Sequence, residues 1–147
     1  MQAALIQLNV SDTPARNLAG TVEMVRDAAA QGAAFVLTPE VTNCVSTSRD
    51  HQRSVLQHED DDITLAALRD VAREAGIWLL IGSLGLKTRD ADGRFANRSF
   101  LIDPQGQIKA RYDKIHMFDV DLPGGESYRE SKNYAHGDAA CLAQTPW

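Results

Sequence analysis

The sequence is short of cysteine and of long apolar runs, and each shortage excludes a class of protein. Its 147 residues contain two cysteines, Cys44 and Cys141, which make neither a disulfide framework nor a Cys-x-x-Cys metal site. Apolar runs such as residues 77–81 are far below the roughly 20 residues that cross a bilayer. The amino end has no basic segment followed by a sustained apolar stretch, so no secretory signal is expected. The sequence therefore predicts a soluble, cytoplasmic protein with both cysteines free and no membrane partner.

Positive charge is also scarce. The chain has 15 basic and 20 acidic residues, a formal net charge of −5 at pH 7. Binding to a phosphate polymer normally needs a basic surface, so no nucleic-acid partner is expected. The 44% hydrophobic and 24% charged fractions are typical of a globular chain, which argues against extensive disorder. The length allows one ordinary domain.

Apolar runs and helical periodicity alternate in the first part of the chain. Residues 3–10 predict a strand buried on both faces, and Pro14 begins a helix that ends near Gly32. Residues 33–37 predict a second buried strand, which Pro39 ends because proline cannot donate to a central ladder. The three elements form a βαβ unit.

The pattern then repeats and changes. Apolar residues at helical spacing over 65–75 predict a second helix, and residues 77–81 a third buried strand. Residues 95–102 and 107–112 flank an Asp-Pro-Gln-Gly turn and predict a hairpin, so the class is α/β with a mixed sheet. Regular pattern fades after this hairpin, although residues 139–147 fit an edge strand followed by a turn.

Two charged residues directly follow predicted strands. Glu40 follows the second strand, and Lys114 follows the hairpin. Ligand sites in open α/β sheets lie beyond the carboxyl ends of strands. A carboxylate there is predicted to have its pKa raised toward that of a general base, and a lysine to stabilise a developing oxyanion. The alternative is a solvated surface charge, which is also the first interpretation of Glu130 in its polar run.

Histidine and acidic residues gather in one short stretch, which raises the question of a metal site. His51, His58, Glu59 and the acidic run at 60–62 are residue types that bind cations. No His-Glu-x-x-His or His-x-His spacing occurs, and the acidic run is explained by the dipole of the following helix. No glycine-rich phosphate loop occurs either. Neither a metal nor an organic cofactor is predicted.

Around Glu40 and Lys114 the chain resembles the amino-terminal half of the nitrilase superfamily, the carbon–nitrogen hydrolases. It is most similar to the branch of omega-amidases and deaminated glutathione amidases, and the resemblance covers nearly all of the chain. The motifs that carry it are Ala4-Leu5-Ile6-Gln7-Leu8, Leu37-Thr38-Pro39-Glu40, Leu80-Ile81-Gly82-Ser83, the segments 97–106 and 112–120, and the loop 123–131.

The resemblance implies a partial αββα sandwich with a mixed sheet, which forms a homodimer and hydrolyses a short omega-amide of a carboxylic acid. It places two members of the family's glutamate–lysine–cysteine set at Glu40 and Lys114, and an additional site glutamate at Glu130. Arg129, beside Glu130, is expected to help bind a substrate carboxylate. In this chemistry the glutamate takes the proton of a thiol, the thiolate attacks the amide carbon, and water hydrolyses the resulting thioester.

The family's nucleophile motif, similar to Gly-x-x-Ile-Cys-Tyr-Asp-x-Arg, is missing. The neighbours of Cys141 do not match it, and Cys44 resembles a small buried or loop residue near Glu40. One interpretation is that residues 1–147 are the amino-terminal part of a single hydrolase domain, incomplete at the C-terminus and inactive alone, which pairs with a second copy or a complementing C-terminal half. The other interpretation is a complete but degenerate binding module of the same fold, without catalysis.

Overall fold

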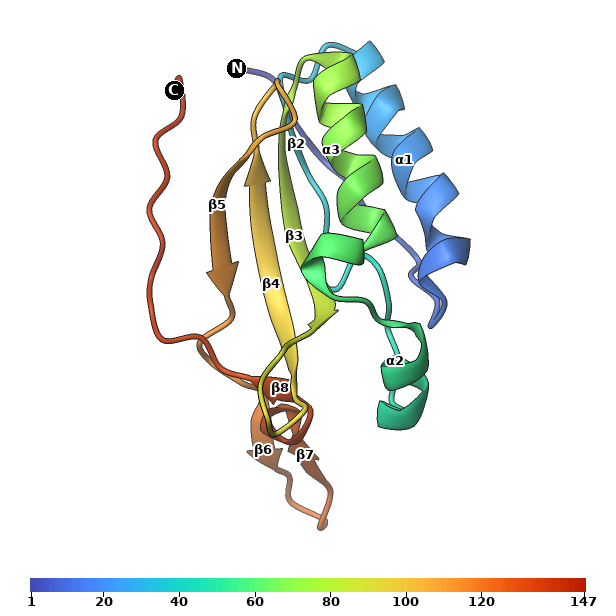
Figure 1. The fold of residues 1–147 in the computed structure, drawn as a ribbon, viewed down its shortest axis with the longest axis vertical. Coiled ribbons are helices and arrows are strands. Elements are labelled where there is room, and N and C mark those ends of the chain that lie inside the picture. Colours follow the sequence, from blue (N-terminus) through green and yellow to red (C-terminus); the bar gives the residue numbers. More distant parts are fainter.

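The computed structural model describes all 147 residues and shows a layer of helices packed against one face of a sheet (Figure 1). The strands are β1 (Ala3–Leu5), β2 (Phe35–Leu37), β3 (Trp78–Lys87), β4 (Phe95–Ile102), β5 (Ile108–Asp113), β6 (Asp119–Asp121), β7 (Ser127–Arg129) and β8 (Tyr134–Ala135). The helices are α1 (Pro14–Ala30), α2 (Arg49–Val55) and α3 (Ile63–Ala75), with 3₁₀ turns η1 (Glu59–Asp61) and η2 (Glu130–Lys132).

The main sheet is mixed, which confirms the predicted α/β class. Its strands follow the order β1-β2-β3-β4-β5, and β8 pairs with β4 beyond the end of β5. The first three strands are parallel, β4 is antiparallel to β3, and β5 is antiparallel to β4, so that β5 runs in the same direction as the first three. β6 and β7 form a separate two-stranded sheet. None of the helices is long and apolar enough to span a membrane.

The two long helices begin and end where local signals predict. α1 begins at Pro14. A main-chain N–H at the first position of a helix has no intrahelical partner, so proline, which lacks this N–H, loses no hydrogen bond there. α3 begins after Asp62, whose carboxylate accepts the N–H of Leu65 at 2.8 Å. It ends at Gly76 in the left-handed conformation, with a φ of 66°. The short helix α2 was not predicted because it has no apolar periodicity, although Ser48 caps it.

The helices α1 and α3 cover only one face of the sheet (Figure 1). Fully buried side chains on that side include Val25, Leu68, Leu79 and Phe100, and burial of each such side chain contributes about 1.5–3 kcal/mol. The opposite face, called here the outer face, has no second layer of helices or strands. The prediction of a first strand buried on both faces is therefore wrong: β1 is an edge strand, and Leu5 is 78% exposed.

The C-terminal third differs from the prediction in two places. The short strands β6, β7 and β8 form where regular structure was expected to fade. The edge strand expected over 139–147 does not form, and this segment runs along the outer face without regular structure (Figure 1). Its Trp147 packs edge-on against Phe35 and Trp78, with ring centroids 6.1 and 6.3 Å apart. Apolar contact, rather than main-chain pairing, attaches the segment.

Candidate active site

The loop that carries Glu40 lies against a glycine of the neighbouring strand. β2 continues its pairing with β3 past its end, since the N–H of Gly82 donates to the carbonyl of Thr38 at 3.1 Å. A Cβ at Gly82 would lie only 2.3 Å from Thr38 O and 2.6 Å from Pro39 C. Glycine is the only residue that permits this approach, so Gly82 sets where Glu40 leaves the sheet.

The residue after Glu40 has a strained backbone. Val41 has a φ of 45°, the left-handed region that a β-branched residue avoids at a cost of about 1–2 kcal/mol. Ser83 maintains this conformation: its hydroxyl accepts the N–H of Val41 at 2.8 Å, and its carbonyl accepts the N–H of Thr42 at 2.9 Å. Strain of this kind is often found at functional sites.

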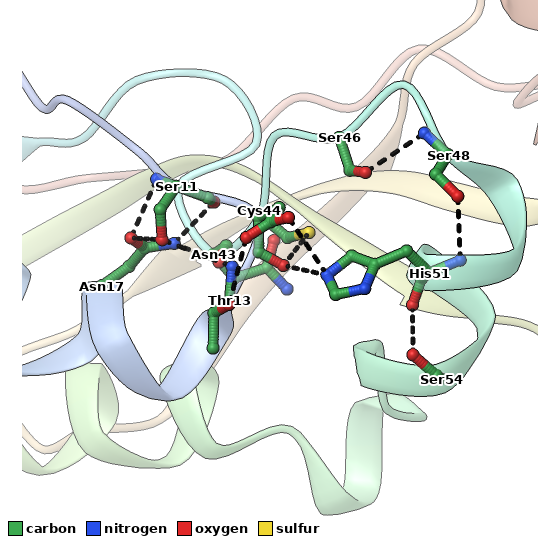
Figure 2. A network of polar contacts seen from close by, with 10 residues as sticks. Ser11, Thr13, Asn17, Asn43, Cys44, Ser46, Ser48, His51 and Ser54 are labelled. Carbon is green, nitrogen blue, oxygen red and sulfur yellow. Dashed lines mark hydrogen bonds and ion pairs between the residues drawn. The ribbon is translucent and has the colours of Figure 1, made fainter.

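A polar network fixes the rest of this loop, residues 41–48, between α1 and α2 (Figure 2). The side-chain amide of Asn17, on α1, donates to the carbonyl of Asn43 at 2.8 Å. Ser48, at the end of the loop, caps α2, because its hydroxyl accepts the N–H of His51 at 3.2 Å. The loop beside Glu40 is thus connected to both helices rather than free in solvent.

Two hydrogen bonds hold the main chain of Lys114, one through its N–H and one through its carbonyl. Its N–H donates to the carbonyl of Asn97 on β4 at 2.9 Å, and its carbonyl accepts the N–H of Gly137 at 2.9 Å. The preceding residue, Asp113, accepts two hydrogen bonds from the guanidinium of Arg98 at 2.6 and 2.8 Å. A guanidinium and a carboxylate joined by two hydrogen bonds are fixed in orientation and bind more strongly than a pair joined by one. The end of β5, which Lys114 follows, is therefore held in place.

The three predicted site residues Glu40, Lys114 and Glu130 converge. Lys114 Nζ lies 3.0 Å from Glu40 Oε1 and 2.9 and 3.0 Å from the two carboxylate oxygens of Glu130. Glu130 also accepts the N–H of Phe118 at 2.7 Å. The side chain of Glu40 is 57% exposed, whereas that of Glu130 is 17% exposed. One ammonium thus bridges an exposed and a largely buried carboxylate.

The charges of this cluster determine the direction of the pKa shifts. Burial alone would raise the pKa of Glu40, but hydrogen bonds from Lys114 and Asn97 and the lysine charge lower it below its ordinary value. Burial alone would lower the pKa of Lys114, but its bonds to Glu130 and Glu40 raise it. The predicted upward shift of the Glu40 pKa is therefore wrong, because a cation lies beside the carboxylate.

Asn97 is a site residue that the sequence analysis did not single out. Its side-chain amide donates to Glu40 Oε1 at 2.7 Å, and the residue is only 3% exposed. The available signal was a polar residue inside the strand β4. Periodicity marks such a position as inward-facing without indicating what it contacts.

The cluster borders an open hollow of about 340 Å³. Val45 and Phe118 also line it, and they are 51% and 61% exposed. Cys44 lies in the same wall, but it is 1% exposed and its thiol donates to the carbonyl of Asp12 at 3.3 Å. Burial, assisted by the charge of Asp12, raises the pKa of Cys44 to about 11. Such a thiol is a poor nucleophile at neutral pH.

The other cysteine and the predicted substrate arginine lie elsewhere. Cys141 is exposed on the outer face, in a depression that it shares with Leu80 and Tyr112. Arg129, on β7, has its guanidinium 2.5 Å from Asp121 Oδ1 and does not line the hollow. Across the whole chain, no group of three or more His, Cys, Asp or Glu side chains is arranged to bind a metal ion.

The chain is similar to known proteins in family, sequence and structure. A family model described as "Carbon-nitrogen hydrolase" matches residues 2–146. A deaminated glutathione amidase of Yersinia enterocolitica is 35% identical over 144 residues, which are 97% of this chain and 50% of that protein. The human omega-amidase NIT2 is 33% identical over 144 residues, 98% of this chain and 50% of that protein. The chain thus spans about half the length of the curated relatives it matches.

Solved structures share the fold. The NitFhit protein of C. elegans superposes with a TM-score of 0.80 at 24% identity, over 92% of this chain and 33% of that one. An amidase from Nesterenkonia sp. AN1 superposes with a TM-score of 0.72 at 24% identity, over 95% of this chain and 50% of that one. Both matches place the architecture among nitrilase-type α/β folds.

Proposed function

The chain belongs to the carbon-nitrogen hydrolase family, and we propose that it provides the glutamate–lysine part of an amidase site. The observation that carries this proposal is the position of Lys114, within 3.0 Å of Glu40 and 2.9 Å of Glu130. An ammonium between two carboxylates can stabilise an oxyanion on one side while a carboxylate moves a proton on the other.

In the proposed reaction Glu40 takes the proton of a cysteine thiol, and the thiolate adds to the amide carbon. Lys114 stabilises the negative charge that develops on the amide oxygen. The carbon–nitrogen bond breaks as the nitrogen receives the proton from Glu40, and ammonia leaves. Water then gives a proton to Glu40 and its hydroxide adds to the thioester, which releases the acid and the thiolate.

The nucleophile is proposed to come from outside residues 1–147. Cys44 is buried and Cys141 is on the outer face, so neither lies beside Glu40 in a reactive form. On this proposal the chain is the amino-terminal part of one hydrolase domain, which pairs with a complementing C-terminal half or within a homodimer. The same two observations favour a second candidate function, a non-catalytic binding module.

The proposed substrate is a short omega-amide of a carboxylic acid, which follows the names of the relatives. Arg129 stays a prediction as the group that binds the substrate carboxylate, and this role requires its contact with Asp121 to open. A cytoplasmic location also stays a prediction; two free cysteines agree with a reducing compartment.

The test is amide turnover by the protein produced from its native gene, with its intact mass measured first. Ammonia release from a panel of omega-amides is expected, and Glu40→Gln and Lys114→Met should each lower kcat by at least about 10²-fold. Arg26→Gln is a matched control, since it breaks an exposed ion pair with Glu74 on the helical layer and should leave turnover unchanged. Absence of turnover in a correctly folded protein would favour the binding module, and full activity of either site variant would refute the assignment.

A further inference from the structure

Asn97 contacts both charged partners of the site through different atoms. Its side-chain Nδ2 donates to Glu40 Oε1 at 2.7 Å, while its main-chain carbonyl accepts the N–H of Lys114 at 2.9 Å. It lies near the start of β4, opposite Gly85 on β3, and is 3% exposed. A single buried residue on a rigid strand therefore sets the separation of a glutamate and a lysine from different loops.

The two hydrogen bonds to Glu40 converge on one oxygen. Asn97 Nδ2 and Lys114 Nζ both donate to Oε1, at 2.7 and 3.0 Å, and no side-chain or main-chain donor contacts Oε2. Glu130 differs, because Lys114 contacts both of its oxygens. With Oε1 held by two donors, the Glu40 carboxylate cannot rotate without losing both bonds, although its side chain is 57% exposed.

Lys114 alone would hold this carboxylate weakly. It makes two contacts with Glu130, at 2.9 and 3.0 Å, and one with Glu40. The bond from Asn97 is the shorter of the two that Glu40 accepts, and its donor is neutral, so it orients the carboxylate without cancelling the negative charge.

We propose that Asn97 is a positioning residue for the general base: together with Lys114 it holds Oε1 of Glu40, so that Oε2 is the atom that accepts and returns the proton. This inference rests on the proposed function, in which Glu40 is the base. It adds which oxygen reacts and which residue selects it.

The first test measures Glu40 itself and does not need activity. The carboxyl ¹³C shift of Glu40 is followed against pH in the protein produced from its native gene, as wild type and as Asn97→Ala. The other titratable groups around Glu40 are Lys114, Glu130, Cys44 and Tyr134. The midpoint of Glu40 should move to higher pH in Asn97→Ala, because a lowering hydrogen bond is lost while burial remains.

Two further variants keep this test decisive. Asn97→Ser leaves a polar group in the strand that is too short to reach Glu40, so it should raise the midpoint even if Asn97→Ala folds poorly. Thr88→Val removes a 2.7 Å hydroxyl bond to the carbonyl of Arg94 in the β3–β4 connection and should leave the midpoint unchanged. An unaltered Glu40 midpoint in both Asn97 variants overturns the proposal.

The second test measures turnover of the best amide. Loss of orientation without loss of binding should lower kcat by about 10- to 100-fold in Asn97→Ser with little change of KM, and should move the acid limb of kcat to higher pH. A rise of KM alone would contradict a positioning role. If the wild type hydrolyses no amide, the proposed function fails, while the ¹³C titration still decides whether Asn97 holds Glu40.

Discussion

At the candidate site one cation is shared by two carboxylates. Lys114 lies within 3.0 Å of both Glu40 and Glu130, so the three groups together carry one uncompensated negative charge. This contact raises the pKa of Lys114 and, together with the hydrogen bond from Asn97, lowers the pKa of Glu40. The same contact therefore links the stability of the fold to pH.

The link predicts losses of stability at both ends of the pH scale. Stability from Glu40 is present above the unfolded pKa of glutamate, about 4.3, and is lost as pH falls through the lower folded pKa. Stability from Lys114 is present below the unfolded pKa of lysine, about 10.4, and is lost as pH rises through the higher folded pKa. Urea unfolding of Lys114→Met should show a flatter profile at both ends, whereas Lys132→Met should follow the wild type. Parallel profiles for Lys114→Met and wild type would contradict the link.

The sequence selected three charged residues that the structure brings together, but it did not predict their environment. Glu40 and Lys114 follow strands, and that position alone marked them, while Glu130 was placed only by resemblance to a family. The direction of the Glu40 pKa was wrong because its nearest cation is 74 positions away. Asn97 was missed because a polar residue in a strand shows nothing of its partner 57 positions earlier.

Among the elements, the β4–β5 turn is fixed by its packing against α3. Gly106 has a φ of 74°, and a Cβ there would lie 2.7 Å from the carbonyl oxygen of Arg69 on the helix. Arg69 in turn donates from Nε to Gly106 O at 2.9 Å. Gly93 has a similar φ of 65°, but the nearest atom to its Cβ would be the flexible end of Arg53 at 3.7 Å.

A comparison of alanine variants at the two glycines separates the cost of backbone strain from the cost of a steric clash with α3. Gly93→Ala should lower the free energy of unfolding by about 1–2 kcal/mol, the cost of a left-handed residue with a Cβ. Gly106→Ala should lower it further, because a helix carbonyl must also move. Chemical denaturation of both variants measures the difference, and equal losses would mean that the turn moves away from α3 at no cost.

Elements with strong local signals were predicted, and those that depend on distant partners were not. Proline and glycine marked both ends of α1 and of the β4–β5 turn within a few residues, whereas an acidic run precedes α3 and Gly76 ends it. β3 extends to Lys87, well past the predicted Ile81, because β4 pairs along it and compensates for its glycines. β8 has two residues and exists only through its pairing with β4 at Phe95 and Ala96.

At the scale of the whole molecule, the outer face of the sheet is partly covered by the segment 139–147. Trp147 packs on Phe35 and Trp78, whereas Leu142 of the same segment is 99% exposed. In the 147-residue chain, Trp147→Ala should lower the free energy of unfolding by about 1 kcal/mol and increase binding of a fluorescent apolar dye. Leu142→Ala is the matched control and should change neither. Equal effects of the two variants would show that the segment does not dock on the sheet.

The site also unites residues that are far apart along the chain. Glu40 meets Asn97 from 57 positions away and Lys114 from 74. Contacts of such separation form slowly, since the intervening chain must first be ordered. The first three strands and their helices contain Glu40 but neither Asn97, on β4, nor Lys114, directly after β5. The pair of Glu40 and Lys114 is complete only when β5 has joined the sheet, so its formation reports that the strands up to β5 are assembled.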